Sequence, residues 1–179
     1  AAFAVNTSFA DMPPDVVETS KQMMLNSAAV GLAGSAQKEG KIITQFVQQL
    51  GGKPQCTVMG AGIRSSPVNA ALANGTMVHV LDYDEAILRR GNHPSNAMFP
   101  TVMALGEQMG LPGRDVVAAF AIGCEVSTKT GAAGDFDELL PSMSRYGWHL
   151  ESIAGTIGAA AAAGKLLGLD QEQMEVALG

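Results

Sequence analysis

The chain has 179 residues and a net charge of −6, and its charged residues make up only 16%, against the roughly 25% that is usual for soluble domains. This length suits one domain, and so few charges indicate much buried surface, either against another chain or within a larger protein. Lysine and arginine form no stripe, which argues against nucleic acid as a partner. Cys56 and Cys124 belong to no CxxC pair, which favours buried thiols in a reducing, cytoplasmic compartment.

The first half of the chain predicts three helices. The first opens at Pro13-Pro14, where a missing N–H does no harm, and stops at Gly34. A second, amphipathic helix in QKEGKIITQFVQQLGG ends at Gly51-Gly52. Residues 56–60 are β-prone but find no strand partner nearby, so an isolated extended segment is expected. The third helix has Ser66 as its N-cap and runs to about Leu81.

The second half is also helical in its patterns. NAMFPTVMALGEQMG predicts a helix despite Pro100, and GRDVVAAFAIGCEVSTKTG is apolar nearly all round, which predicts a central helix. Residues 131–147 look irregular. Residues 153–168 are apolar but shorter than the ~20 residues of a membrane span and contain Lys165, so they predict a buried helix, from about His149 to Leu167.

Small residues fill that helix and let neighbouring helices approach closely, although each glycine costs it ~1 kcal/mol relative to alanine. The last helix starts at Asp170, with Gln173 completing a capping box. It has only about eight residues when the chain stops, which predicts a chain cut from a larger protein. The sum is an all-α fold in a single helical domain, residues 1–179.

The polar stretch LDYDEAILRRGNHPSN, residues 81–96, has several possible uses. A dinucleotide fingerprint at GAGIRS lacks its third glycine and is followed by no βαβ unit. An EF-hand starting at Asp82 would place Ile87 where glycine is required and His93 where glutamate is expected. A transition-metal site using Asp82, Asp84, His93 and His149 matches no standard spacing and stays a minor option.

The three histidines leave two interpretations open. His79 lies on a helix three residues before Asp82 and is interpreted as a structural histidine. His93 lies in the polar loop, and His149 follows Gly147-Trp148 at a helix start, where backbone N–H groups favour an anion. Two histidines near helix ends with loop carboxylates suit general acid–base chemistry. A polar loop between helices is, however, more often a solvated turn.

Four segments, in this order and over nearly the whole chain, resemble the N-terminal part of the MmgE/PrpD family of 2-methylcitrate dehydratases and cis-aconitate decarboxylases. They are MPPDVVETSKQMMLNSAAVGLAGS, ALANGTMVHVLDYDE, HPSNAMFPTVMALGE and GWHLESIAGTIGAAAAAGKLLGLDQEQMEVALG. The resemblance implies a large helical domain with a smaller α+β lid, a homodimer, and no cofactor. It implies substrates that are small di- or tricarboxylic acids, which lose water, lose CO2 or are epimerised.

The family motif also implies the site residues. It places Asp82, His93 and His149 around the substrate as catalytic residues, with Asp84 as a second acid. Asp84, Arg89, Arg90 and Ser95 are the expected substrate-binding residues. Where many relatives have Asp-Asp-Thr, this chain has Asp84-Glu85-Ala86, and its loop up to His93 is about one residue longer.

These features predict a cofactor-independent lyase of the 2-methylcitrate dehydratase type. The alternatives are an iminodisuccinate epimerase-like enzyme or a cis-aconitate decarboxylase-like enzyme of the same family, and, from another class, a non-catalytic helical dimerisation module. Because the family lysines that help to hold the substrate come later than Gly179, residues 1–179 alone are expected to be inactive.

Overall fold

The computed structural model describes residues 1–87, 93–131 and 145–179 of the chain, and most of these residues are helical. The elements, in chain order, are α1 Ala2–Asn6, the 3₁₀ turn η1 Phe9–Asp11, α2 Pro14–Ser35, α3 Lys38–Leu50, β1 Cys56–Val58, β2 Ile63–Ser65, α4 Pro67–His79, α5 Ser95–Met109, α6 Gly113–Gly131, α8 Leu150–Leu166 and α9 Gln171–Leu178. The predicted mostly helical fold is confirmed. The two short elements before α2 had no prediction.

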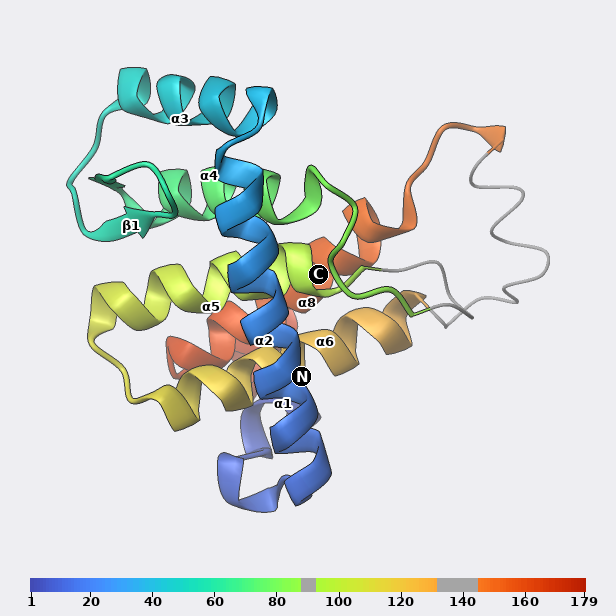
Figure 1. Cartoon of the computed structure of the whole chain (residues 1–179). Coiled ribbons are helices and arrows are strands. Elements are labelled where there is room, and N and C mark those ends of the chain that lie inside the picture. The colour runs from blue at the N-terminus through green and yellow to red at the C-terminus, as the bar shows by residue number, and fades with distance from the viewer. Residues whose placement is uncertain (88–92, 132–144) are drawn as a thin grey trace.

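Helix α2 crosses in front of α4, α5 and α6, and α8 lies behind α5 and α6 (Figure 1). It begins at Pro14, as predicted, and runs one residue beyond Gly34. Gly34 has a further role, because a Cβ atom there would overlap the backbone oxygen of Met77 on α4. The glycine therefore sets how closely α2 approaches α4 as well as lying near the end of the helix.

Two short strands correct the expectation of an isolated extended segment. β1 pairs with β2 in an antiparallel hairpin, in the register Cys56↔Ser65, Thr57↔Arg64 and Val58↔Ile63. The chain reverses within the four residues between them, where Gly60 and Gly62 have φ angles of 66° and 67°. Glycine adopts such angles without a steric penalty, so a tight turn brings the partner strand from only a few residues away.

Helices α6 and α8 pack closely against each other, as the small residues of α8 predicted. Phe120 and Ile122 of α6 are almost fully buried, which confirms the central position expected for this helix. A Cβ atom built at Gly158 of α8 would lie 2.6 Å from the backbone oxygen of Gly123 and 2.7 Å from Cβ of Ser127. Glycine at 158 is therefore what allows the two helices to approach.

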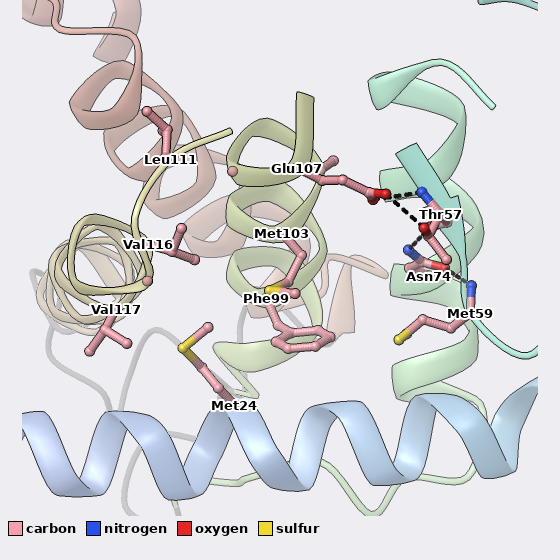
Figure 2. A pocket seen from close by; sticks show the side chains of 13 residues that line it. Met24, Thr57, Met59, Asn74, Phe99, Met103, Glu107, Leu111, Val116 and Val117 are labelled. Atoms are coloured by element: carbon pink, nitrogen blue, oxygen red, sulfur yellow. Dashed lines mark hydrogen bonds between the residues drawn. The ribbon is translucent and has the colours of Figure 1, made fainter. Parts of the chain in front are cut away.

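Polar contacts of Glu107 on α5 connect the β1–β2 hairpin to the helices (Figure 2). Its carboxylate accepts hydrogen bonds from the backbone N–H and the hydroxyl of Thr57, both at 2.7 Å, and pairs with Arg64 at 2.9 Å. The Asn74 amide adds two bonds, accepting from the Met59 N–H and donating to the Thr57 carbonyl, each at 2.9 Å. These polar contacts close one end of an otherwise apolar cavity of about 600 Å³ between α2, α5 and α6.

We expect Glu107→Gln to destabilise the fold at neutral pH but not in acid. Burial raises the pKa of Glu107, but the bonds from Thr57 and the Arg64 charge outweigh it and hold the pKa below its ordinary value of 4.5. A carboxyl with a lowered folded-state pKa stabilises the fold above its unfolded pKa, and this contribution is lost as the pH falls through the folded pKa.

Urea unfolding at pH 7 should show a loss of about 1 kcal/mol in the variant, since solvent screens this partly exposed group. The loss should shrink near pH 3. Glu175→Gln, the same change at an exposed position of α9, serves as control. Equal losses at both pH values would contradict the prediction.

Both cysteine thiols have a pKa raised by burial, with the larger effect at Cys124. The Cys56 thiol is fully buried and donates a hydrogen bond to the Ala104 carbonyl at 3.1 Å, in line with the expected buried thiols. Among the described residues, none of the helices combines the length and the apolar character that crossing a bilayer requires.

Candidate active site

Three helix ends bring the predicted site residues together. His79 is the last residue of α4, and His93 stands just before Pro94, the N-cap of α5. His149 is the N-cap residue of α8. Because α5 packs against both α4 and α8, the polar stretch after α4 lies beside the start of α8. Four of the predicted site residues, Asp82, Asp84, His93 and His149, therefore lie in one region.

Asp84 is the buried centre of this region. Its side chain is 0% exposed, and both of its carboxylate oxygens lie 3.1 Å from Nδ1 of His79. Nδ1 of His93 lies 3.4 Å from the same carboxylate. The two imidazole rings meet edge to face, with centroids 5.4 Å apart. A buried carboxylate needs polar partners to offset its desolvation, and the His79 ring hydrogen-bonds to Asp84 whereas the His93 ring lies close to it without a hydrogen bond.

Asp82 differs from Asp84 in being open to solvent. Its side chain is 77% exposed, and its Oδ1 lies 3.8 Å from Nε2 of His93. Its backbone has a φ of 56°, the left-handed region, and it is the only non-glycine residue so found among those the structure describes. Its N–H donates to the His79 carbonyl at 2.9 Å, which ends α4 in a turn. Aspartate adopts this conformation more readily than most residues, although at some cost in energy.

Glu151, in the first turn of α8, is a third acidic side chain near these histidines that sequence reasoning missed. Its carboxylate is 9% exposed and contacts Nδ1 of His149 at 2.5 Å. It also accepts a hydrogen bond from the backbone N–H of His93 at 3.1 Å and lies 3.9 Å from Nε2 of that ring. The available signal was its place two residues after the GWH segment, where a helix start favours a carboxylate.

A cavity of about 680 Å³ opens beside these side chains, between α4, α5 and α8. Its polar lining includes His79, His149, Glu151, Thr76, Asn96 and Thr156. Within the described ranges no lysine or arginine lines it. Positive charge for a substrate carboxylate must therefore come from protonated imidazoles there or from other parts of the protein. His79, interpreted from sequence as structural, lies both on this cavity and against Asp84.

The remaining predicted residues have different surroundings. Ser95, the first residue of α5, is fully buried, and its hydroxyl has no hydrogen-bond partner among the residues that the structure describes. Arg89 and Arg90 lie in the stretch 88–92, outside the described residues. Ala86, which stands where many relatives have threonine, is exposed. The substrate-binding roles expected for Asp84, Arg89, Arg90 and Ser95 stay predictions.

The same side chains include one set that could hold a metal ion. His79, Asp82, Asp84 and His93 each offer a ligand atom, and these atoms lie within 4.8 Å of one another. Imidazole and carboxylate ligands suit Zn²⁺, Mn²⁺ or Fe²⁺. The set is equally suited to proton transfer, because His79, Asp84 and His93 already contact one another without an ion.

Known proteins resemble this chain over nearly all of its length. The MmgE/PrpD N-terminal domain model matches residues 1–179. Cis-aconitate decarboxylase of Mus musculus is 33% identical over 168 residues, which is 91% of this chain and 33% of that protein. The Homo sapiens enzyme is also 33% identical over 168 residues, 91% of this chain and 34% of that protein.

Cis-aconitate decarboxylase of Aspergillus terreus is 30% identical over 182 residues, covering 99% of this chain and 36% of that protein. The chain thus spans about a third of the length of these relatives. The match over every residue, in the order of the motifs that bring the acids and histidines together, shows that the chain belongs to the MmgE/PrpD family and corresponds to its N-terminal domain.

Proposed function

We propose that the protein is a lyase acting on a small carboxylic acid by proton transfer at a carbon next to a carboxylate. The observation that carries this proposal is the gathering of three imidazoles and three carboxylates beside one cavity, from three helix ends. The family and the decarboxylase relatives support a lyase. A proton next to a carboxylate is weakly acidic, so its removal needs a placed base and groups that stabilise the developing negative charge.

Asp82, His93 and His149 share the proton transfers in this proposal. In a dehydration, one of them takes the proton from the carbon, and a second protonates the departing hydroxyl as its C–O bond breaks, so that an alkene and water are formed. His149 suits one of these roles because its ring is 68% exposed and lines the cavity, and because, among the described residues, Glu151 contacts its Nδ1 and no residue contacts its Nε2. Its Nε2 is thus the nitrogen available for a substrate.

The leading candidate reaction is dehydration of a hydroxy-tricarboxylate such as 2-methylcitrate. The loop departs from the family at Ala86, which stands where many relatives have a threonine, and this counts against a direct assignment to the decarboxylases. Decarboxylation of cis-aconitate is the second candidate, and the names of the similar proteins favour it. An epimerase would share the first proton abstraction but return the proton to the other face.

Three measurements on the full-length protein separate these reactions. With 2-methylcitrate, dehydration gives a conjugated alkene that absorbs in the ultraviolet. With cis-aconitate, decarboxylation releases CO2. Epimerisation gives neither signal but exchanges the α-proton for deuterium from the solvent. We expect the ultraviolet signal with 2-methylcitrate. The proposed lyase function is wrong if neither acid is turned over by protein that is folded and full-length.

Removal of metal ions tests how the His79, Asp82, Asp84 and His93 set is used. If these side chains transfer protons and hold no metal, dialysis against EDTA should leave kcat within about twofold of its starting value, because direct contacts keep the network in place. Added Zn²⁺ should inhibit, because it competes for the same ligand atoms. A loss of activity in EDTA that a divalent ion restores would assign the set to a metal instead.

A further inference from the structure

We propose that Glu151 is a positioning residue that joins the two predicted catalytic histidines across the site. This proposal rests on the proposed function, in which His93 and His149 transfer protons. His149 begins α8, whereas His93 belongs to the segment before α5, so nothing in the local chain fixes one relative to the other. The Glu151 carboxylate contacts both, by the His93 backbone N–H and by Nδ1 of the His149 ring.

Both oxygens of Glu151 are engaged in this bridge. Oε1 accepts from the His93 N–H at 3.1 Å, while Oε2 contacts His149 Nδ1 at 2.5 Å. Within the described part of the chain, no lysine or arginine pairs with this carboxylate, and its polar partners are the two histidines. The charge lies in the first turn of α8, where the helix dipole favours an anion. These contacts and the helix dipole therefore stabilise the ionised carboxylate at a nearly buried position, without a contribution from substrate.

The bridge has two consequences for the chemistry. The close contact at Nδ1 engages that ring nitrogen of His149 and leaves Nε2 for reaction, because the partner of one nitrogen in a histidine ring decides the role of the other. Nε2 is then the atom of His149 that faces substrate. The bond to the His93 backbone holds that residue where its ring reaches Asp84 at 3.4 Å and Asp82 at 3.8 Å. Misplacement of such groups by about 1 Å can cost a hundredfold in rate.

Glu151→Gln in the full-length protein tests the bridge. Glutamine keeps the shape of the side chain but replaces one acceptor oxygen by an NH2 group, so it cannot serve both donors. We expect amide hydrogen exchange at His93 to become at least about tenfold faster, because the bond from its N–H to a charged acceptor is weakened. We expect kcat to fall about a hundredfold, with KM changed less than threefold, because Glu151 positions the histidines and does not bind substrate.

Two further variants complete the experiment. Glu151→Ala removes both acceptors and should lower kcat further than glutamine does. Glu175→Gln makes the same chemical change on exposed α9 and should change neither readout. Thermal melting of each variant checks that it is folded.

The exchange rate at His93 is measured without substrate, so it tests the bridge separately from the proposed lyase reaction. An unchanged exchange rate in both Glu151 variants overturns the bridge. A kcat within threefold of the parent protein overturns the positioning role. Failure of the parent protein to turn over either acid would refute the proposed function. Faster exchange at His93 in Glu151→Gln would still support the contact between Glu151 and the His93 N–H.

Discussion

Full-length protein with His149→Ala should lose about a thousandfold in kcat on the acid that the parent protein turns over. The proposed function makes His149 one of the proton-transfer groups, and such groups contribute about 10²–10⁴ to a rate. Its exposed ring lines the cavity beside Glu151, so alanine leaves an open space where Nε2 stood. KM should change much less than kcat, because the lost contribution is made mainly in the transition state.

Added imidazole gives a further check on this variant. A small imidazole can enter the space left by the ring and carry protons in its place, so it should restore part of kcat in His149→Ala. Leu167→Ala is a suitable control, because it truncates an exposed side chain at the opposite end of the same helix. A kcat for His149→Ala within tenfold of the parent, on folded protein, would remove His149 from the proposed machinery.

Gly158→Ala should lower the free energy of unfolding by about 2–3 kcal/mol. The added methyl group would lie 2.6 Å from the Gly123 carbonyl oxygen and 2.7 Å from Cβ of Ser127, both on α6. Neither atom can rotate away, because one belongs to the backbone and the other is attached to it. The helices must move apart, and overpacking of a tight core costs about 1–3 kcal/mol. Urea unfolding monitored by circular dichroism measures the loss.

Gly155→Ala is the matched control on the same helix. A Cβ atom there would meet only Cβ of Ala97, at the ordinary contact distance of 3.4 Å. Alanine also favours a helix over glycine by up to about 1 kcal/mol, so this variant should be neutral or more stable. If both variants shift stability in the same direction by similar amounts, close approach of α6 and α8 does not explain the glycine at 158.

The parts of the fold that could be predicted are those with local signals. The Ser66 side chain accepts from the Asn69 N–H at the start of α4, and Asp170 and Gln173 form the predicted capping box of α9. The hairpin was missed because its strands are only three residues long and leave no alternating pattern to read. Composition predicted that α8 packs closely, but it could not tell Gly155 from Gly158, since only the neighbouring helix distinguishes them.

The candidate site likewise has a part that could be predicted from the sequence and a part that could not. Asp82, His93 and His149 come from motifs whose residues are near one another in sequence. The contacts of Glu151 cannot be predicted from a local motif, because its hydrogen-bond partner His93 is 58 residues away in the sequence. The part played by Asp84 also depends on folding, since its burial between His79 and His93 requires α4 and α5 to be packed together. Contacts that join distant segments leave no pattern in the sequence of either one.

The meeting of three helix ends at this site ties its integrity to the docking of α8. Helix α8 supplies His149 and Glu151 from its first turn, while its middle is held by α6 through Gly123 and Gly158. Any local opening that separates α8 from α6 therefore also draws the imidazole of His149 away from Asp82 and His93. On heating, the proposed lyase activity would then be lost before the protein melts globally, because this one helix undocks before the remaining core unfolds.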